Sequence, residues 1–279
     1  MSGNSMLYFA PLITGLLFPV TFIITYTISV SADTIKPLFS YISDTGAYPP
    51  ASGVFTLLLS IASLALAVVV FIRYKQIEEF FREQNSKVNK IFNIVGLFLG
   101  LAAALGTDMV GSFQETHSYT GHFTGAFMAF LGGGLYLIMQ SYFTFKMVPL
   151  FASKVLAWAR LFMGIMVCIL FLICFGVGTV SIRQYRENGG PDPTRWEKKY
   201  GAWELHIISV STEWMMAAFL DLYILSFIPE FKKIAMDELK FTLVELRKVA
   251  GNNNNNINKN EVVVMHRIEQ RSRDIEDDV

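Results

Sequence analysis

Six stretches of about twenty apolar residues dominate this chain of 279 residues. Roughly 20 apolar residues in an α-helix are needed to cross the hydrocarbon core of a bilayer. The chain is 53% hydrophobic and 16% charged, whereas a soluble domain carries about 25% charged residues. The sequence therefore predicts an all-α membrane protein with a bundle of six transmembrane helices joined by short loops. The expected spans are roughly 8–30, 53–71, 91–110, 123–145, 161–180 and 205–228.

The first stretch could also be read as a cleaved signal peptide, because Val30-Ser31-Ala32 resembles a cleavage site. No Lys or Arg precedes this stretch, and its apolar run exceeds the usual 7–15 residues of a signal peptide. We therefore expect it to remain as the first span.

The orientation is predicted from Lys and Arg, which concentrate on the cytosolic side of membrane proteins. With both termini in the cytosol, 17 basic residues face inward and 6 face outward. The exception is the fifth loop, at 183–199, which holds five of those six outward residues. The asymmetry predicts cytosolic termini.

The segment after the sixth span divides into two parts. Residues 231–250 are amphipathic and are expected to lie along the inner leaflet, where basic side chains could bind anionic lipids. Residues 251–279 are Asn-rich, then charged, and are expected to be disordered. Their last three residues, 277–279, could bind a cytosolic partner by strand addition. The candidate lipid-binding residues are Lys232, Lys233, Lys240, Arg247 and Lys248.

Ionisable side chains inside the spans are the candidates for function, because each costs about 2.5–3.5 kcal/mol near the bilayer centre and needs a partner. His206 and Glu213 lie seven residues apart on the sixth span, hence on one helix face. His122 enters the fourth span from the same side, and Asp44 lies in the first outward loop. We expect these four residues to form a polar pocket in the outward half, with Asp108, Gln114 and Glu115 as secondary candidates.

Three interpretations of this cluster remain open: a structural hydrogen-bond network, a site for a lipid headgroup or ion, and a catalytic site. The chain contains no HExxH, P-loop, GxGxxG after a strand, or GxSxG motif. We therefore expect no enzyme activity, cofactor or metal. The zero formal net charge gives no indication of nucleic-acid binding.

A tyrosine-based pattern lies at the inner end of the second span. Tyr74 and Ile77 fit the tyrosine-x-x-apolar signal that endosomal adaptors read, and both would face the cytosol. The alternative is that Tyr74 is an interfacial anchor.

Several short motifs occur in the order found in one membrane-protein family. They are Tyr41-Ile-Ser-Asp-Thr-Gly46, Pro49-Pro50, Arg73-Tyr-Lys-Gln76, Phe113-Gln114, His122-Phe-Thr-Gly-Ala126, Gly134-Leu-Tyr136, Gln140, Arg160, His206 and Glu213-Trp214. With these motifs the chain resembles the FRAG/DRAM/Sfk family, which shares the Cwh-type N-terminal domain. It is most similar to the damage-regulated autophagy modulators, in particular the branch of the second paralogue.

The resemblance implies a non-enzymatic, multi-pass regulator of autophagy or lysosomal function in a lysosomal or endosomal membrane. Other branches of the family imply two lipid-handling alternatives: a GPI-anchor lipid remodelling factor and a scaffold for a phosphoinositide kinase. These would place the chain at the Golgi, ER or plasma membrane. The intramembrane acids suggest a further alternative, a small proton-coupled carrier.

Overall fold

The computed structural model of the chain describes residues 6–82 and 87–234. These residues form helices and no strands, and six helical segments are long and apolar enough to cross a membrane. The prediction of an all-α membrane protein with six spans is confirmed. Most of the predicted segment at 231–250, with Lys240, Arg247 and Lys248, lies outside the described residues, as does the tail at 251–279.

The six spans follow one another in sequence and are joined by loops. They are η1 with α1 (Met6–Tyr8, Phe9–Ser31), α2 (Ala51–Phe80), α3 (Lys87–Ser112), the three-part fourth span α4, η3 and α5 (Tyr119–Ala126, Phe127–Gly132, Gly133–Lys146), α6 (Lys154–Glu187), and α7 with α8 (Trp203–Leu225, Ile228–Phe231). Three single-turn helices lie in the loops: η2 (Ser43–Gly46), η4 (Pro193–Arg195) and η5 (Lys198–Tyr200).

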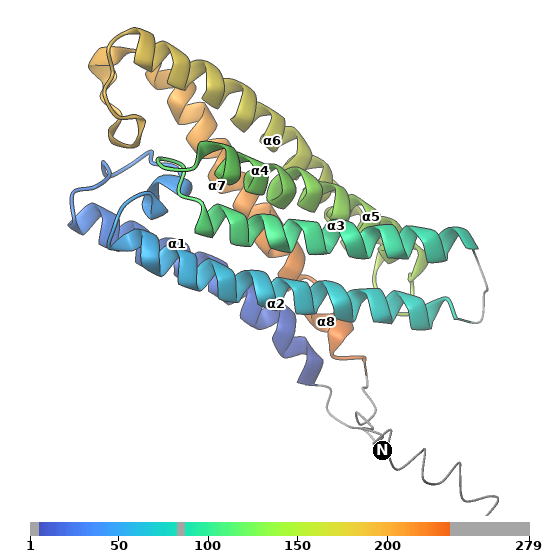
Figure 1. Cartoon of the computed structure of the whole chain (residues 1–279). Helices are drawn as coiled ribbons and strands as arrows, with labels where there is room; N and C mark the ends of the chain where they lie inside the picture. The colour runs from blue at the N-terminus through green and yellow to red at the C-terminus, as the bar shows by residue number, and fades with distance from the viewer. Residues whose placement is uncertain (1–5, 83–86, 235–279) are drawn as a thin grey trace, which may run out of the picture. The chain divides into compact units, whose positions relative to one another are not determined.

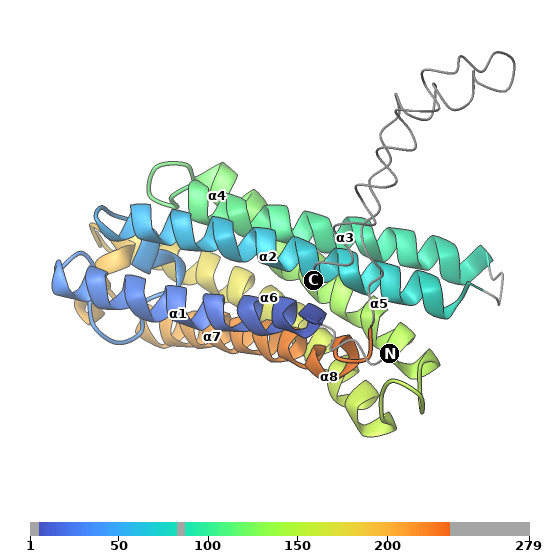
Figure 2. The ribbon, with the colours of Figure 1, turned by 90° about the horizontal axis from the view of Figure 1, so that it is seen from below.

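Each span packs against the next, and α1 also packs against α7, so the bundle closes into a ring. Figure 1 shows the helices running side by side, and Figure 2 shows α1 beside α7 from below. We call the end that carries the loops at 32–50 and 188–202 the outer end, and the opposite end the inner end, following the predicted orientation.

The helices extend beyond the apolar stretches. The longest, α6, has 34 residues, or about 51 Å at 1.5 Å per residue, whereas the prediction covered only 161–180. Ser153 caps its start by accepting a hydrogen bond from the Leu156 amide, and an Arg183–Glu187 ion pair braces its last turns. The apolar pattern marks the part within the bilayer, while caps and side-chain pairs extend the helix beyond it.

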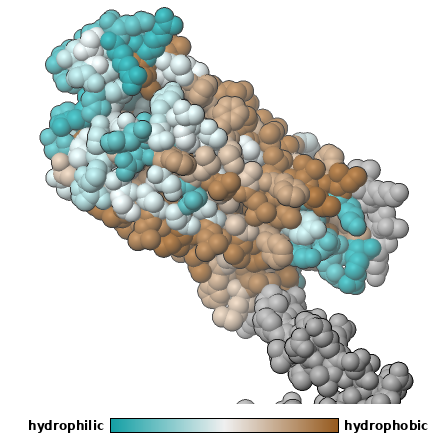
Figure 3. Space-filling view, viewed as in Figure 1, coloured by the Kyte–Doolittle hydropathy of each residue, from teal (hydrophilic) through white to brown (hydrophobic). Residues whose placement is uncertain are grey.

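The bundle is wrapped in apolar side chains. Large residues such as Leu64, Phe98 and Leu172 are more than 60% exposed. On the face in Figure 3, hydrophobic residues form a band between two more hydrophilic ends. A surface of this kind is expected where hydrocarbon replaces water around the protein.

The fourth span contacts different neighbours along its length. A methyl group on Gly125 of α4 would lie 2.7 Å from Met109 Cβ and 2.8 Å from the Gly106 carbonyl oxygen of α3. A methyl group on Gly134 of α5 would lie 2.6 Å from Cys168 Sγ of α6. Glycine therefore lets the outer half approach α3 and the inner half approach α6. The π-turn η3 joins the two halves.

Candidate functional site

A cavity of about 920 Å³ lies in the outer half of the bundle, where α4 leans toward α3. Its walls come from α4, η3, α6 and α7, together with the loops around 41–48 and 191–194. Asp44, Glu115, His122 and Glu213 all line it. The structure therefore brings three of the four predicted pocket residues, and one of the secondary candidates, to a single cavity.

The loop at 41–47 carries Asp44 into the bundle and is buried along most of its length. The Thr25 and Thr45 hydroxyls are 2.9 Å apart, and Ser29 Oγ donates a 2.8 Å hydrogen bond to the Thr45 carbonyl. The Tyr41 amide donates a 2.9 Å hydrogen bond to Asp44 Oδ2. These contacts fix the Asp44 carboxyl in place, with only 3% of the residue exposed.

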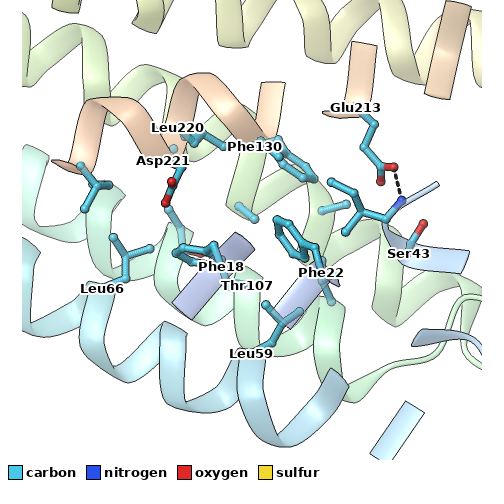
Figure 4. Close-up of a pocket in the computed structure, with 18 of the residues that line it drawn as sticks. Phe18, Phe22, Ser43, Leu59, Leu66, Thr107, Phe130, Glu213, Leu220 and Asp221 are labelled. Carbon is cyan, nitrogen blue, oxygen red and sulfur yellow. Dashed lines mark hydrogen bonds between the residues drawn. The ribbon is translucent and has the colours of Figure 1, made fainter. Parts of the chain in front are cut away.

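Glu213 reaches this loop from α7. Its Oε2 accepts a 2.6 Å hydrogen bond from the Ile42 amide, as Figure 4 shows. The acid on the sixth span and the first outer loop are 171 residues apart in sequence and are joined by this bond. The contact anchors the loop and satisfies one oxygen of a carboxyl group that is otherwise costly to bury.

Glu115 and His122 complete the cluster. Burial, together with the Glu115 carboxylate beside it, raises the pKa of Asp44 well above its ordinary value. Glu115 Oε2 also lies 4.0 Å from His122 Nε2. His122 Nδ1 is 2.8 Å from the Phe113 carbonyl oxygen. Because a carbonyl oxygen only accepts, Nδ1 donates this hydrogen bond, and Nε2 is the ring nitrogen beside Glu115.

His206 does not line this cavity. Its ring stacks on Trp196 with centroids 4.1 Å apart, and its Nε2 lies 2.8 Å from the Phe39 carbonyl oxygen. Tyr41 packs against the same ring. Helical periodicity places His206 and Glu213 on one face of α7, but the aromatic side chains of the outer loops surround His206 and separate its role from that of Glu213.

The other two secondary candidates lie outside the cavity. Asp108 on α3 accepts a 2.5 Å hydrogen bond from Ser60 Oγ of α2. Gln114 contributes its carbonyl oxygen to the turn at 114–118, accepting from the His117 and Ser118 amides. Asp108 therefore joins α3 to α2, and Gln114 stabilises the turn that follows α3.

A second, smaller cavity of about 110 Å³ continues toward the inner end. Figure 4 shows Glu213 at one end and Asp221 at the other, with Phe18, Phe22 and Phe130 between them. Asp221 Oδ1 has no hydrogen-bond partner among the described residues. The rest of the lining is mostly apolar, so Asp221 is a polar group at the edge of an apolar cavity.

The inner end holds a cluster that sequence reasoning missed. Glu230 of α8 is bonded to Arg73 of α2 at 2.5 Å and to Arg160 of α6 at 2.6 Å, and all three side chains are fully buried. Arg73 also donates to Gln140, and Arg160 also donates to Ser226. Buried charges require this degree of pairing.

An aromatic ring lies against both arginines. The guanidinium carbons of Arg160 and Arg73 are 4.6 and 4.9 Å from the centroid of the Phe227 ring, which is within the range of a cation–π contact. Phe227 and Glu230 both lie at the inner end of the sixth span, after helix α7. The sequence did contain a signal for this cluster. An acid stands at the end of one apolar stretch, and basic residues stand at the ends of two others.

The Tyr74–Ile77 pattern lies within helix α2. The Tyr74 hydroxyl donates a 3.1 Å hydrogen bond to Glu78, and Ile77 is buried against Phe143 and Met147. Its apolar position is therefore part of the core, and the folded structure gives no support to its being read as a sorting signal. Among the described residues, no group of three His, Cys, Asp or Glu side chains is placed to hold a metal ion.

Comparison with known proteins extends over nearly the whole bundle. The model of the Frag1/DRAM/Sfk1/Cwh43P N-terminal domain matches residues 6–234. The chain is 30% identical to DNA damage-regulated autophagy modulator protein 2 of Mus musculus over 77% of this chain and 80% of that protein. It is 29% identical to DNA damage-regulated autophagy modulator protein 1 of Homo sapiens, over 77% of this chain and 87% of that protein.

A shorter match connects a further relative. Modulator of macroautophagy TMEM150B-B of Xenopus laevis is 35% identical over 45% of this chain and 53% of that protein. No solved structure matches the chain. The family model spans all six membrane helices, from the start of the first to the residues after Glu230. The chain belongs to the Frag1/DRAM/Sfk1/Cwh43P N-terminal domain family of multi-pass membrane proteins.

Proposed function

We propose that the chain is a membrane regulator of autophagy or lysosomal function that acts without catalysing a reaction. The observation that carries this proposal is similarity through the whole six-span bundle to proteins named as autophagy modulators. The third relative, a modulator of macroautophagy, supports the same assignment over a shorter stretch. No step of chemistry is needed for such a role.

Measurement of autophagic flux in cells that lack the chain tests the proposal. Turnover of a membrane-bound autophagosome marker, with and without an inhibitor of lysosomal degradation, should fall when the gene is disrupted. It should return when the full chain is supplied. Unchanged flux in the disrupted cells would contradict the assignment.

We also propose a lysosomal or endosomal membrane as the site of action. A chain carrying a fluorescent tag should overlap with markers of those organelles at an expression level close to the native one. Residence at the plasma membrane, Golgi or ER would instead favour the lipid-handling branches of the family. A matched control is Tyr74→Phe, which removes the hydroxyl bond to Glu78 and keeps the ring, and it should leave the location unchanged.

The inner end offers a contact with anionic lipids. Lys232 and Lys233 are exposed directly after α8, and Lys233 Nζ donates a 3.2 Å hydrogen bond to the Leu150 carbonyl. A basic residue near the membrane surface contributes about 1 kcal/mol with anionic lipids. The charge reversals Lys232→Glu and Lys233→Glu should weaken retention of the purified chain on phosphatidylserine vesicles, while Lys199→Glu at the outer end should not.

A further inference from the structure

The outer cavity divides into an apolar part and a polar part. Aromatic side chains from three elements line the part nearer the middle of the bundle: Phe123, Phe130, Phe171 and Phe175. The loops and the end of α6 add polar side chains to the outer part, among them Tyr48, Arg186 and Asp192. The lining covers α6 from Phe171 to Glu187, or about 24 Å of helix. Such a shape fits an amphiphile better than a compact solute.

The charges lining the cavity are unequal. Five carboxylates line it, and two guanidinium groups do so, of which Arg183 is already paired with Glu187. The most deeply buried acids are Asp44 and Glu213. An anionic headgroup would therefore meet carboxyl groups at the centre of the cavity, whereas a cation would favour their ionised form and meet opposite charge.

The imidazole of His122 lies beside these acids. The residue is only 5% exposed, its Nδ1 donates to the Phe113 carbonyl, and its Nε2 lies 4.0 Å from Glu115 Oε2, which is longer than a hydrogen bond. The centre of the cavity presents the oxygens of Asp44, Glu115 and Glu213 as acceptors. A group that donates several hydrogen bonds and carries positive charge complements them, and a protonated amine does both.

We propose that the outer cavity binds a single-chain amphiphile with a protonated amine, the amine among Asp44, Glu213 and His122 and the hydrocarbon chain between the aromatic side chains of α4, η3 and α6. A volume of about 920 Å³ lies within the roughly 300–1,000 Å³ of ligand sites. The close approach of α4 to α3 at Gly106 and Gly125 positions one wall of the cavity. This proposal does not depend on the role in autophagy.

Photocrosslinking with the whole 279-residue chain in lipid nanodiscs tests the proposal. The probe is a long-chain primary amine that carries a diazirine in its chain, and the matched probes are the fatty acid and the fatty alcohol of the same length. The amine should label about tenfold more strongly than either, since one charge-assisted hydrogen bond is worth about one decade of affinity. The labelled peptides should include the outer half of α6.

Variants assign the preference to the cavity. Glu213→Gln and Asp44→Asn keep the shape and remove the charge, and each should abolish the preference for the amine over the alcohol. Asp108→Asn is the matched control, because this acid pairs with Ser60 outside the cavity, and its preference should match that of the unaltered chain. If either cavity variant fails to fold, Phe175→Trp provides a second route. Its side chain is 42% exposed beside the cavity, and the larger ring should reduce labelling by the amine.

Several results would overturn the proposal. Equal labelling by amine and alcohol would show apolar binding without charge recognition, and stronger labelling by the fatty acid would show an anionic ligand. A preference that survives both Glu213→Gln and Asp44→Asn would place the amine elsewhere. Labelled peptides confined to other helices would exclude the cavity itself.

Discussion

The two ends of the bundle bury charge in opposite ways. At the inner end, Arg73 and Arg160 share Glu230, and the two nitrogen–oxygen distances of these ion pairs are 2.5 and 2.6 Å. A phenylalanine ring packs on both cations. At the outer end, Asp44, Glu115 and Glu213 line a cavity, and the His122 imidazole lies 4.0 Å from Glu115. One cluster is closed and paired, whereas the other is open and contains an excess of like charge.

The inner cluster is suited to stabilising the bundle, whereas the outer cluster is suited to binding a ligand. The inner ion pairs join the second and fifth spans to the end of the sixth, so they hold three helices at one point. Like charges held together oppose folding instead, and sites of this kind are found where a ligand or a proton is to be handled. We therefore expect substitutions at the two ends to change stability with opposite sign.

The largest effect is expected for Glu230→Gln. It leaves two buried guanidinium groups without a carboxylate, and removing one partner of a buried pair costs about 3–5 kcal/mol. The temperature at which half of the detergent-purified protein aggregates should fall sharply, and the yield should fall with it. Glu79→Gln is the control, since the Arg82–Glu79 pair is more than 60% exposed at both side chains. A Glu230→Gln protein as stable as the unaltered chain would remove the contrast between the ends.

The next effect is expected where α3 and α4 meet. Gly125→Ala places a methyl group 2.7 Å from Met109 Cβ, and overpacking of this kind costs about 1–3 kcal/mol. The variant should unfold at a lower temperature, because the close approach of α4 to α3 is lost. Gly132→Ala is matched to it, since a methyl group there meets no atom within 4 Å. Similar losses in both variants would mean that helix propensity, and not the close approach, is measured.

A small gain is expected for Glu213→Gln. The amide oxygen still accepts the hydrogen bond from the Ile42 amide, and the repulsion from Asp44 and Glu115 is removed. The melting temperature should stay level or rise, with a stabilisation of up to about 1 kcal/mol. A loss comparable to that of Glu230→Gln would show that this carboxylate is itself part of an ion pair.

The smallest effect is a dependence on pH that originates at the outer end. Burial and Glu115 raise the pKa of Asp44, so the folded chain binds more protons than the unfolded chain between the ordinary pKa, about 3.9, and the raised value. The free energy of unfolding should therefore decrease as the pH rises through that interval. Melting curves from mildly acidic to neutral pH should show the decrease, and Asp44→Asn should reduce its slope. A stability that rises with pH in this interval would contradict the assignment.

The spans were predictable because length and apolar composition suffice to identify helices that cross a bilayer. Asp44, His122 and Glu213 were predictable as neighbours because each is costly to bury and needs a partner in the same half. The surroundings of His206 were not predictable, because helical periodicity identifies the face on which a residue lies but does not identify the loop that packs over that face. Trp196, which stacks on its ring, comes from a loop without a recognisable pattern.

Glu230 escaped prediction for a different physical reason. From the sequence alone, a single acid at the end of an apolar stretch is interpreted as a residue in the membrane interface. Arg73 and Arg160 are likewise interpreted as cytosolic charges that set the orientation. Only the folded contacts show that these three side chains are internal. Without Arg73 and Arg160, the excess of inward basic residues remains.

The π-turn at Phe127–Gly132 has a consequence for comparing members of the family. Such a turn holds one residue more than an α-helical turn of the same rise, and one residue rotates the rest of the helix by about 100°. A relative that lacks a single residue there would present a different face of its outer half to α6 while keeping the inner half unchanged. A one-residue gap at this segment in an alignment would therefore mark a relative whose outer cavity is lined by different residues of the fourth span.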